Sequence, residues 1–519
     1  MRDPITKCAV ILVLLCPQAN AQTDALAWKS KHGKELMAAG KFEEAIPIYR
    51  ELVKELPDNP GPVMNLGMAL HMAGYEEEAV REFQEVLKLE PGHLPARLFL
   101  GAAYLALREP NKAVEPLQVV VRTQPDNSEA RLMLGDGLLS MGRYLASLEQ
   151  YEELSRLDPA NPKVWSGLGE SFEGLASQSF DTLEKLARES SYWLVLVAET
   201  RVKAEHYSHA FFLYREALAK TPTLRGVHAA IAEIYRKSGH EDWAIVEEEK
   251  ERQLPPLNCE GREGLRDGRA NSSAPSRANR NHRASEMECD FLAGRYRRIV
   301  AANSQTAEEY YWRTRAYNEL ARQAFSHLAD LPPSAEVHEL LAKIHFSQKN
   351  YASAAKDWAE ALKLAPGNSF YEQGLAISVS AGGNYEAARP LLERAVKQSP
   401  DSVELNYWLG FTLLGLEKAE DAVPYLERAV KGDPTVLQPQ RELARAYLRI
   451  GQVEKAIPHL KTALPLDDDG TLYYQLAQAY RKAGQKELER QMLVKFREIQ
   501  SSSSAEKKKF EKSLEITPP

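Results

Sequence analysis

Apolar and polar residues follow one pattern along most of this chain, and the pattern repeats every 34 residues. Four stretches show it without a gap: residues 60–93, 94–127, 128–161 and 403–436. Within the first of them, Leu66 and Leu70 lie four residues apart, and Phe83, Val86 and Leu87 follow at similar spacings. Such spacings place apolar side chains on one face of a helix. Each unit is therefore predicted to be a pair of amphipathic helices.

Small residues recur at two fixed places of each unit. The eighth place holds Gly33, Gly67, Gly101, Gly135, Ala198, Ala232, Ala342, Ala376, Gly410, Ala444 and Ala477. The twentieth place holds Ala45, Ala79, Ala113, Ser147, Ala210, Ala244, Ala354, Ala388, Ala422 and Ala456. The distance between two packed helices depends on the side chains at their contact, so these places predict a close approach within each pair.

Turn and stop signals fall at fixed places as well. A glycine or a polar residue near the fifteenth place predicts the turn between the two helices, as at Gly40, Gly74, Gly142, Gly239 and Gly451. A late proline ends the second helix, because it has no N–H to continue the hydrogen-bond ladder. It stands at Pro57, Pro91, Pro125, Pro159, Pro222, Pro256, Pro366, Pro400 and Pro434. One helix pair cannot bury its apolar faces alone, so neighbouring pairs are predicted to stack.

This spacing resembles the tetratricopeptide repeat (TPR) family. Eleven regular units begin at Leu26, Pro60, Leu94, Ser128, Ser191, Arg225, Ala335, Ser369, Val403, Leu437 and Gly470. The resemblance implies an all-α fold, an α-solenoid of TPR helix-turn-helix repeats with about eleven regular and two degenerate units. It says little about function, because the family is defined by packing positions.

Two stretches depart from the regular pattern. Residues 162–190 begin like a unit but leave only 29 residues before the next one, which predicts a helix pair with a shortened turn or second helix. Residues 259–284 contain six arginines and almost no apolar side chain, so they are predicted to form a basic irregular linker. We interpret this linker as a solvated spacer, with a docking strand for an acidic partner or RNA as the alternative.

The linker separates two predicted arrays. The N-terminal TPR array covers residues 22–258, and the C-terminal TPR array covers residues 285–500, with degenerate first helices up to about residue 332. Residues 501–519 are polar and are predicted to be a disordered tail.

The first 21 residues have the features of a Sec-type signal peptide. Arg2 and Lys7 precede a nine-residue apolar run, and Ala19 and Ala21 supply the small residues of a cleavage site. A short uncleaved anchor is the alternative, but nine residues fall short of the about 20 that span a membrane as a helix. We therefore expect cleavage near Ala21 and a mature chain without a membrane span, exported to the periplasm or beyond. Peripheral association with the envelope stays open.

Removal of residues 1–21 would leave two cysteines, Cys259 and Cys289. In an oxidising compartment such a pair is predicted to form a disulfide. A bridge closing a loop of about 30 residues stabilises the folded state by roughly 3–4 kcal/mol in the chain-entropy description. Two unrelated buried thiols are the alternative, and a zinc site lacks the required CxxC or histidine pair.

Charge and motifs exclude several functions. The net charge is −7, which disfavours binding to the phosphate backbone of nucleic acids. The chain has no GxSxG turn, no Walker loop and no GxGxxG after a strand. His206 and His209 are interpreted as surface residues rather than metal ligands. The sequence thus predicts no catalytic residue, no cofactor and no metal site.

The family resemblance implies that the second, fifth, ninth and twelfth places of each unit line a concave groove. In the C-terminal array this set includes Phe370, Tyr407, Phe411, Arg441, Arg445, Tyr474 and Arg481. Aromatic rings beside arginines can hold a peptide by stacking and bind its carboxylates. The N-terminal array offers an apolar floor of Met64, Met68, His71, Leu98 and Leu105, suited to adaptable contacts. The alternative is that these side chains pack on neighbouring helices.

We therefore predict a non-enzymatic exported TPR scaffold that binds a peptide or protein partner in its concave groove, in an envelope assembly or export system. Two alternatives remain. The chain could be a regulatory or substrate-recruiting arm of an envelope enzyme, or a glycan-binding module that uses its tryptophans.

Overall fold

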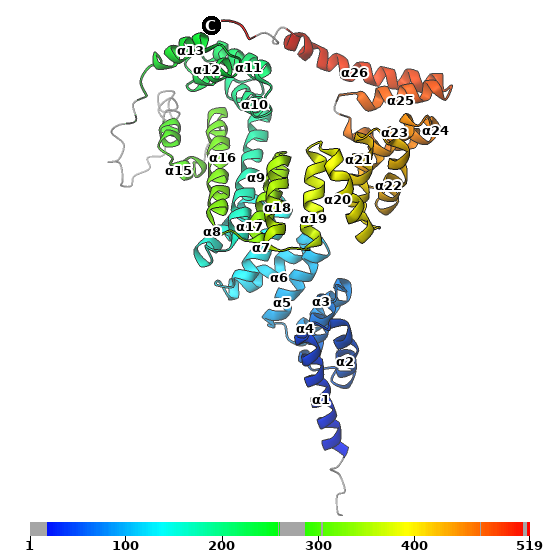
Figure 1. Cartoon of the computed structure of the whole chain (residues 1–519). Helices are drawn as coiled ribbons and strands as arrows, with labels where there is room; N and C mark the ends of the chain where they lie inside the picture. The colour runs from blue at the N-terminus through cyan, green and yellow to red at the C-terminus, as the bar shows by residue number, and fades with distance from the viewer. Residues whose placement is uncertain (1–17, 258, 260–285, 303–304, 468, 512–515) are drawn as a thin grey trace, which may run out of the picture. The chain divides into compact units, whose positions relative to one another are not determined.

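A computed structural model describes residues 18–257, 259, 286–302, 305–467, 469–511 and 516–519, although the side chains of residues 18–23 and 501–511 are not described. Helices follow one another along these residues, and no strand occurs among them (Figure 1). The chain divides into two compact units, Met1–Gly174 and Leu175–Pro519. The predicted all-α solenoid of consecutive helix pairs is confirmed.

The first unit consists of consecutive helix pairs. Its helices are α1 (Gln18–Ala38), α2 (Phe42–Glu55), α3 (Pro60–Met72), α4 (Glu76–Leu89), α5 (Leu94–Ala106), α6 (Pro110–Thr123), α7 (Ser128–Ser140), α8 (Tyr144–Leu157) and the start of α9 (Pro162–Ala187). From α1 to α8, each helix packs on the next one along the chain, as a stacked array requires. Helix α9 contacts α8 where Gly167 lies against the ring of Tyr151.

Besides the end of α9 and a helical stretch at residues 286–292, the second unit contains further helices. They are α10 (Ser191–Lys203), α11 (Tyr207–Lys220), α12 (Val227–Lys237), α13 (Glu241–Arg252), α15 (Tyr296–Val300), α16 (Ala307–Asp330), α17 (Ala335–Ser347), α18 (Tyr351–Leu364), α19 (Ser369–Ala381), α20 (Tyr385–Gln398), α21 (Val403–Gly415), α22 (Ala419–Gly432), α23 (Leu437–Arg449), α24 (Val453–Ala463), the 3-10 helix η1 (Leu464–Leu466), α25 (Thr471–Lys482) and α26 (Lys486–Glu511). Helix α16 packs on α10 as well as on its chain neighbours.

The small residues lie where the two helices of a pair touch. Ala79, at a twentieth place, is 0% exposed. A Cβ atom added to Gly67, at an eighth place, would lie 2.6 Å from Cε1 of Phe83, closer than a carbon atom can come. Where serine replaces alanine, at Ser147, its hydroxyl donates to the carbonyl of Gly135 at 2.9 Å, so the buried polar atom is satisfied. The predicted close approach is therefore present.

The turn inside each pair requires a left-handed backbone at the fifteenth place. Gly451 has φ +78°, a conformation that costs glycine little. Four of the 34-residue repeats have a residue other than glycine there instead: Arg108, Glu205, Lys349 and Glu417, with φ between 57° and 61°. A left-handed residue other than glycine costs about 1–2 kcal/mol. The stacking of these repeats therefore imposes the turn on residues that disfavour it.

One prediction about the repeats is wrong. Residues 162–190 do not form a helix pair, because α9 is one continuous helix of 26 residues. Its fifteenth residue is Ala176, which is a good helix former and is 4% exposed, where other units have a turn residue. Leu175 and Leu183 continue the apolar face at helical spacing and are 7% and 0% exposed. No residue stops the helix, so it runs on.

The degenerate stretch before residue 332 contains one long helix. Helix α16 begins with a capping box, in which Thr306 and Glu309 exchange side-chain and backbone hydrogen bonds. Cys259 and Cys289 are joined by a disulfide across a sequence separation of 30, with their Cα atoms 5.6 Å apart. The predicted linker lies outside the described residues apart from Cys259.

The two ends of the chain lie partly outside the described residues. Residues 1–17 of the predicted signal peptide belong to that part. Helix α26 continues to Glu511, past residue 500, through alanine, glutamate and lysine residues that favour helices. Residues 516–519 are described, and the backbone carbonyl of Thr517 accepts a hydrogen bond from the Tyr235 hydroxyl at 2.6 Å.

Substitutions at the fifteenth place should change stability in opposite directions. Replacement of Glu417 by glycine relieves the left-handed strain and should raise the free energy of unfolding by roughly 0.5–1 kcal/mol. Replacement of Gly451 by alanine introduces the same strain and should lower it by about 1 kcal/mol. Urea unfolding followed by far-UV circular dichroism measures both. Shifts of the same sign would contradict backbone strain as their cause.

Candidate functional site

Helices α21 and α23 bring together three residues of the predicted C-terminal groove. Phe411, Arg441 and Arg445 line a cavity of about 450 Å³. The cavity is completed by Glu442, Leu466, Asp467, Asp469, Thr471, Leu472 and Gln475. We call this cavity the C-terminal pocket. Apolar, cationic and anionic groups therefore face the same space.

Glu442 is the electrostatic centre of the pocket. Glu442 is only 1% exposed, and its carboxylate is paired with two arginines. Arg441 Nε lies 3.0 Å from Oε1, and Arg445 Nη1 lies 3.0 Å from Oε2. A buried carboxylate needs such partners to remain ionised. The carboxylate thereby holds both guanidinium groups at the pocket wall, where their side chains are still 40% and 36% exposed.

An aromatic cluster adjoins the arginines. The rings of Tyr407 and Phe411 lie 6.1 Å apart, and Trp408 contacts both at 5.1 and 5.5 Å. Burial raises the pKa of the Tyr407 hydroxyl to about 12, the Glu442 carboxylate adds to the rise, and Arg441 and Arg445 oppose it. Tyr407 thus senses the charge of the same ion-paired group, although it does not line the pocket itself.

The acidic turn before α25 forms the opposite rim. The Asp469 carboxylate accepts the backbone N–H of Thr471 at 2.9 Å, and the Asp467 carboxylate accepts that of Tyr473 at 2.8 Å. The hydrogen bonds from Thr471 lower the pKa of Asp469 below its ordinary value. Both carboxylates thus accept backbone N–H groups of the first turn of α25, where a helix N-terminus favours negative charge.

The other residues of the predicted C-terminal set lie outside the pocket lining. Phe370 on α19 is 49% exposed, with Lys343 Nζ 5.3 Å from its ring centroid. Tyr474 on α25 is 44% exposed, and its ring lies 5.2 Å from the ring of Phe496 of α26 in a tilted arrangement. Arg481, near the end of the same helix, is exposed. These residues offer surface contacts rather than a shared cavity.

Sequence reasoning did not single out Glu442. It stands at the sixth place of its unit, where the preceding unit has Trp408. A carboxylate at a place that is apolar in the preceding unit was the available signal, because buried charges are rarely found without a partner. Leu466 and Leu472 were also missed, since they belong to the junction between two repeats.

The predicted N-terminal floor is partly covered, because one of its five residues is buried and the other four are half-buried. Met64 is 7% exposed, and Met68 is partly buried against the same core. Leu98 and Leu105 are partly buried against the next cluster. Nδ1 of His71 lies 2.6 Å from Oε2 of the Glu76 carboxylate. These side chains therefore contact neighbouring helices to a large extent.

Two histidines share one carboxylate between α17 and α18. His338 and His345 each hydrogen-bond one oxygen of Asp357, at 3.1 and 2.8 Å.

Across the described part of the chain, no group of three metal-ligating side chains is arranged to hold an ion. Among the same residues, no helix combines the length and the apolar character needed to cross a bilayer.

Comparisons with known proteins agree with the repeat pattern. Three family models, each described as tetratricopeptide repeat, match residues 30–80, 132–201 and 374–436, residues 70–137 and 413–480, and residues 335–368. Together these matches cover more than half of the chain. No curated protein matches it.

Several solved structures are similar to parts of the chain. MamA from Desulfovibrio magneticus RS-1 is 27% identical, with 28% of this chain and 84% of that chain covered and a TM-score of 0.28. YrrB, described as a TPR protein with an unusual peptide-binding site, is 17% identical, with 37% and 83% covered and a TM-score of 0.26.

Removal of the charge at residue 442 should change the titration of Tyr407. In a Glu442→Gln variant the anion that raises the pKa is lost and the two arginines that lower it remain, so the pKa of Tyr407 should fall from about 12 toward its ordinary value. NMR of tyrosine labelled in the ring with carbon-13 measures this, with Tyr407→Phe assigning the signal.

Glu404→Gln is the matched control, because it removes an exposed carboxylate from the same helix as Tyr407. The native chain holds the Tyr407 proton more tightly than the unfolded chain does. Its contribution to stability is therefore complete below pH 10 and is lost as the pH rises toward 12. An unchanged Tyr407 titration in Glu442→Gln would contradict the described ion-pair geometry.

Proposed function

Because this chain belongs to the tetratricopeptide repeat family, we propose that it is a non-enzymatic scaffold whose C-terminal pocket binds a segment of a protein partner. The observation that carries the proposal is the convergence of Phe411, Arg441 and Arg445 on one cavity. Ligand sites combine apolar walls with a few convergent polar groups, and this cavity has both.

The pocket offers hydrogen-bond donors that its own residues do not use. The side chains of Arg441 and Arg445 are 40% and 36% exposed, so part of each guanidinium group is still accessible. A guanidinium group carries five N–H donors, and Glu442 occupies only some of those on Arg441 and Arg445. Backbone carbonyls of an extended segment are suitable acceptors, because they satisfy the donors without adding a charge beside Asp467 and Asp469.

The apolar wall supplies the rest of the interaction. Phe411, Leu466 and Leu472 line one cavity with the arginines. An aliphatic or aromatic side chain of the partner would bury its surface against them and gain about 25 cal/mol per Å². A segment with one apolar side chain and free backbone carbonyls therefore fits better than an acidic segment, whose carboxylate would compete with Glu442.

We further propose that the scaffold is exported and works in an envelope assembly or export system. The signal-like residues 1–21 and the Cys259–Cys289 disulfide support this, because disulfides persist in oxidising compartments. Glycan binding through tryptophan faces is disfavoured at Trp312 and Trp358, which are 6% and 5% exposed. No observation favours a role as the arm of an enzyme.

Loss of the pocket arginines should abolish partner binding. We expect the mature chain to retain a protein partner in an affinity pulldown from envelope extract, and an Arg441→Ala/Arg445→Ala variant to lose it. Arg394→Ala/Lys397→Ala is the matched control, because it removes two exposed cations from α20 and should bind normally. Circular dichroism must first show that all chains fold. Retention of the same partner by both double variants would refute the pocket assignment.

Export should leave a chemical record on the chain. We expect the chain isolated from its producing cells to begin at Gln22 and to contain no free thiol, as measured by intact mass after alkylation without reductant. A Cys289→Ser variant is the control, because it should expose one alkylatable thiol at Cys259. Reduction should lower the free energy of unfolding by roughly 3–4 kcal/mol. A chain that begins at Met1 with free thiols would contradict export.

A further inference from the structure

The structure already holds one extended segment against a repeat. Thr517 accepts a hydrogen bond through its backbone carbonyl from the Tyr235 hydroxyl at 2.6 Å. Ile516 packs against the hydrophobic cluster that contains Tyr235. The next residue, Pro518, biases Thr517 toward an extended backbone, which leaves its carbonyl free of helical hydrogen bonding. An aliphatic side chain, a backbone carbonyl and a proline together form the bound element.

Tyr235 stands at the eleventh place of its unit, at the junction with the preceding repeat. Its ring lies 5.4 Å from Phe211 and 5.5 Å from Trp243. Arg215, four residues after Phe211, carries its guanidinium 6.0 Å from the Phe211 ring. We call this arrangement the Tyr235 site.

The 34-residue register leads to a second tyrosine at the same place of its repeat, surrounded by different side chains. Tyr104 is the eleventh residue of its unit, as Tyr235 is of its own. The places of Phe211, Arg215 and Trp243 relative to Tyr235 are those of Val80, Gln84 and Lys112 relative to Tyr104. These three residues and Tyr104 line one cavity of about 420 Å³, completed by Glu77, Leu107 and Glu109. We call it the Tyr104 pocket.

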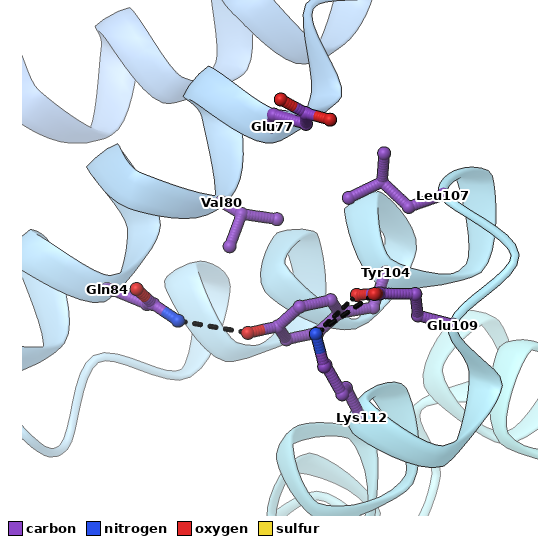
Figure 2. A pocket seen from close by; sticks show the side chains of 7 residues that line it. All are labelled: Glu77, Val80, Gln84, Tyr104, Leu107, Glu109 and Lys112. Atoms are coloured by element: carbon purple, nitrogen blue, oxygen red, sulfur yellow. Dashed lines mark hydrogen bonds and ion pairs between the residues drawn. The ribbon is translucent and has the colours of Figure 1, made fainter.

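Figure 2 shows the side chains that line the Tyr104 pocket and the interactions among them. Gln84 Nε2 donates to the Tyr104 hydroxyl at 2.9 Å, so the hydroxyl keeps its own proton to donate. Val80 and Leu107 provide apolar contacts. Lys112 is paired with Glu109 at 2.8 and 2.9 Å and lies 5.7 Å from the Tyr104 ring centroid, at the rim.

We propose that the Tyr104 pocket binds an extended polypeptide segment of the form aliphatic–X–Pro from a partner, with the Tyr104 hydroxyl donating to the backbone carbonyl of X. The aliphatic side chain contacts Val80 and Leu107, as Ile516 contacts the core at the Tyr235 site. This site is separate from the C-terminal pocket and does not depend on the function proposed above.

A peptide of residues 514–519 with both ends blocked is the probe. Labelled for fluorescence anisotropy, it should bind the full chain at one site, because residues 516–519 already occupy the Tyr235 site. A chain cut after Glu515 should bind two peptides. Tyr104→Phe should weaken binding to the full chain about 3–10-fold, the effect of one lost hydrogen bond. Val80→Asp should abolish it by placing a charge in the apolar wall.

Two controls test whether binding depends on the Tyr104 hydroxyl and on the aliphatic side chain of the peptide. Tyr75→Phe alters an exposed tyrosine of the repeat that begins at Pro60, which does not line the Tyr104 pocket, and should leave the affinity unchanged. A peptide with Ile516 replaced by serine should bind at least tenfold more weakly. The proposal is overturned if the full chain does not bind the peptide, or if Tyr104→Phe and Val80→Asp, shown to be folded by circular dichroism, bind it as the unaltered chain does. It is also overturned if only Arg441→Ala/Arg445→Ala removes binding, which would place the peptide in the C-terminal pocket.

Discussion

The contact between the eighth and twenty-fourth residues of each unit determines how closely its two helices pack. A Cβ atom on Gly101 would lie 2.5 Å from Cγ of Leu117, and one on Gly410 would lie 2.5 Å from Cγ of Leu426. Because the helices meet this closely, the turn between them is short and its fifteenth residue must be left-handed, even where that residue is Glu417. The same constraint keeps the register constant, so residues at equal places of different repeats occupy equivalent positions relative to the neighbouring helices. The likeness between Tyr104 and Tyr235 follows from that register.

The fold could be predicted because its signals are local. Gly74 and Pro91 are the turn and stop residues of one repeat, and each affects only the helix ends next to it. Helix α4, for example, ends at Leu89, just before that proline. The repeat period predicts a turn near residue 176, but no residue there ends a helix. This local sequence outweighs the period, so α9 is continuous. The contact between Tyr235 and Thr517 joins residues separated by 282 positions, and no periodic pattern predicts such a contact.

The candidate site was predictable only in part. Phe411, Arg441 and Arg445 were identified because the family resemblance assigns inner places of the groove. Glu442 was not, because its importance comes from two partners that approach one buried carboxylate in three dimensions. Met64 also occupies an inner place by the same resemblance, yet it is only 7% exposed. A place in a repeat gives a direction, and the neighbouring repeat determines how much of the side chain remains exposed.

The central claim is that the C-terminal pocket is the surface that meets a protein partner. Site-specific photocrosslinking tests it most directly, with a photoreactive phenylalanine analogue in place of Phe411, which lines the pocket, or of Leu488, an exposed residue of α26. In the cells that produce the protein, the account predicts a discrete crosslinked product of higher mass from position 411 and none from position 488. The same product from both positions, or a product from position 488 alone, would contradict it.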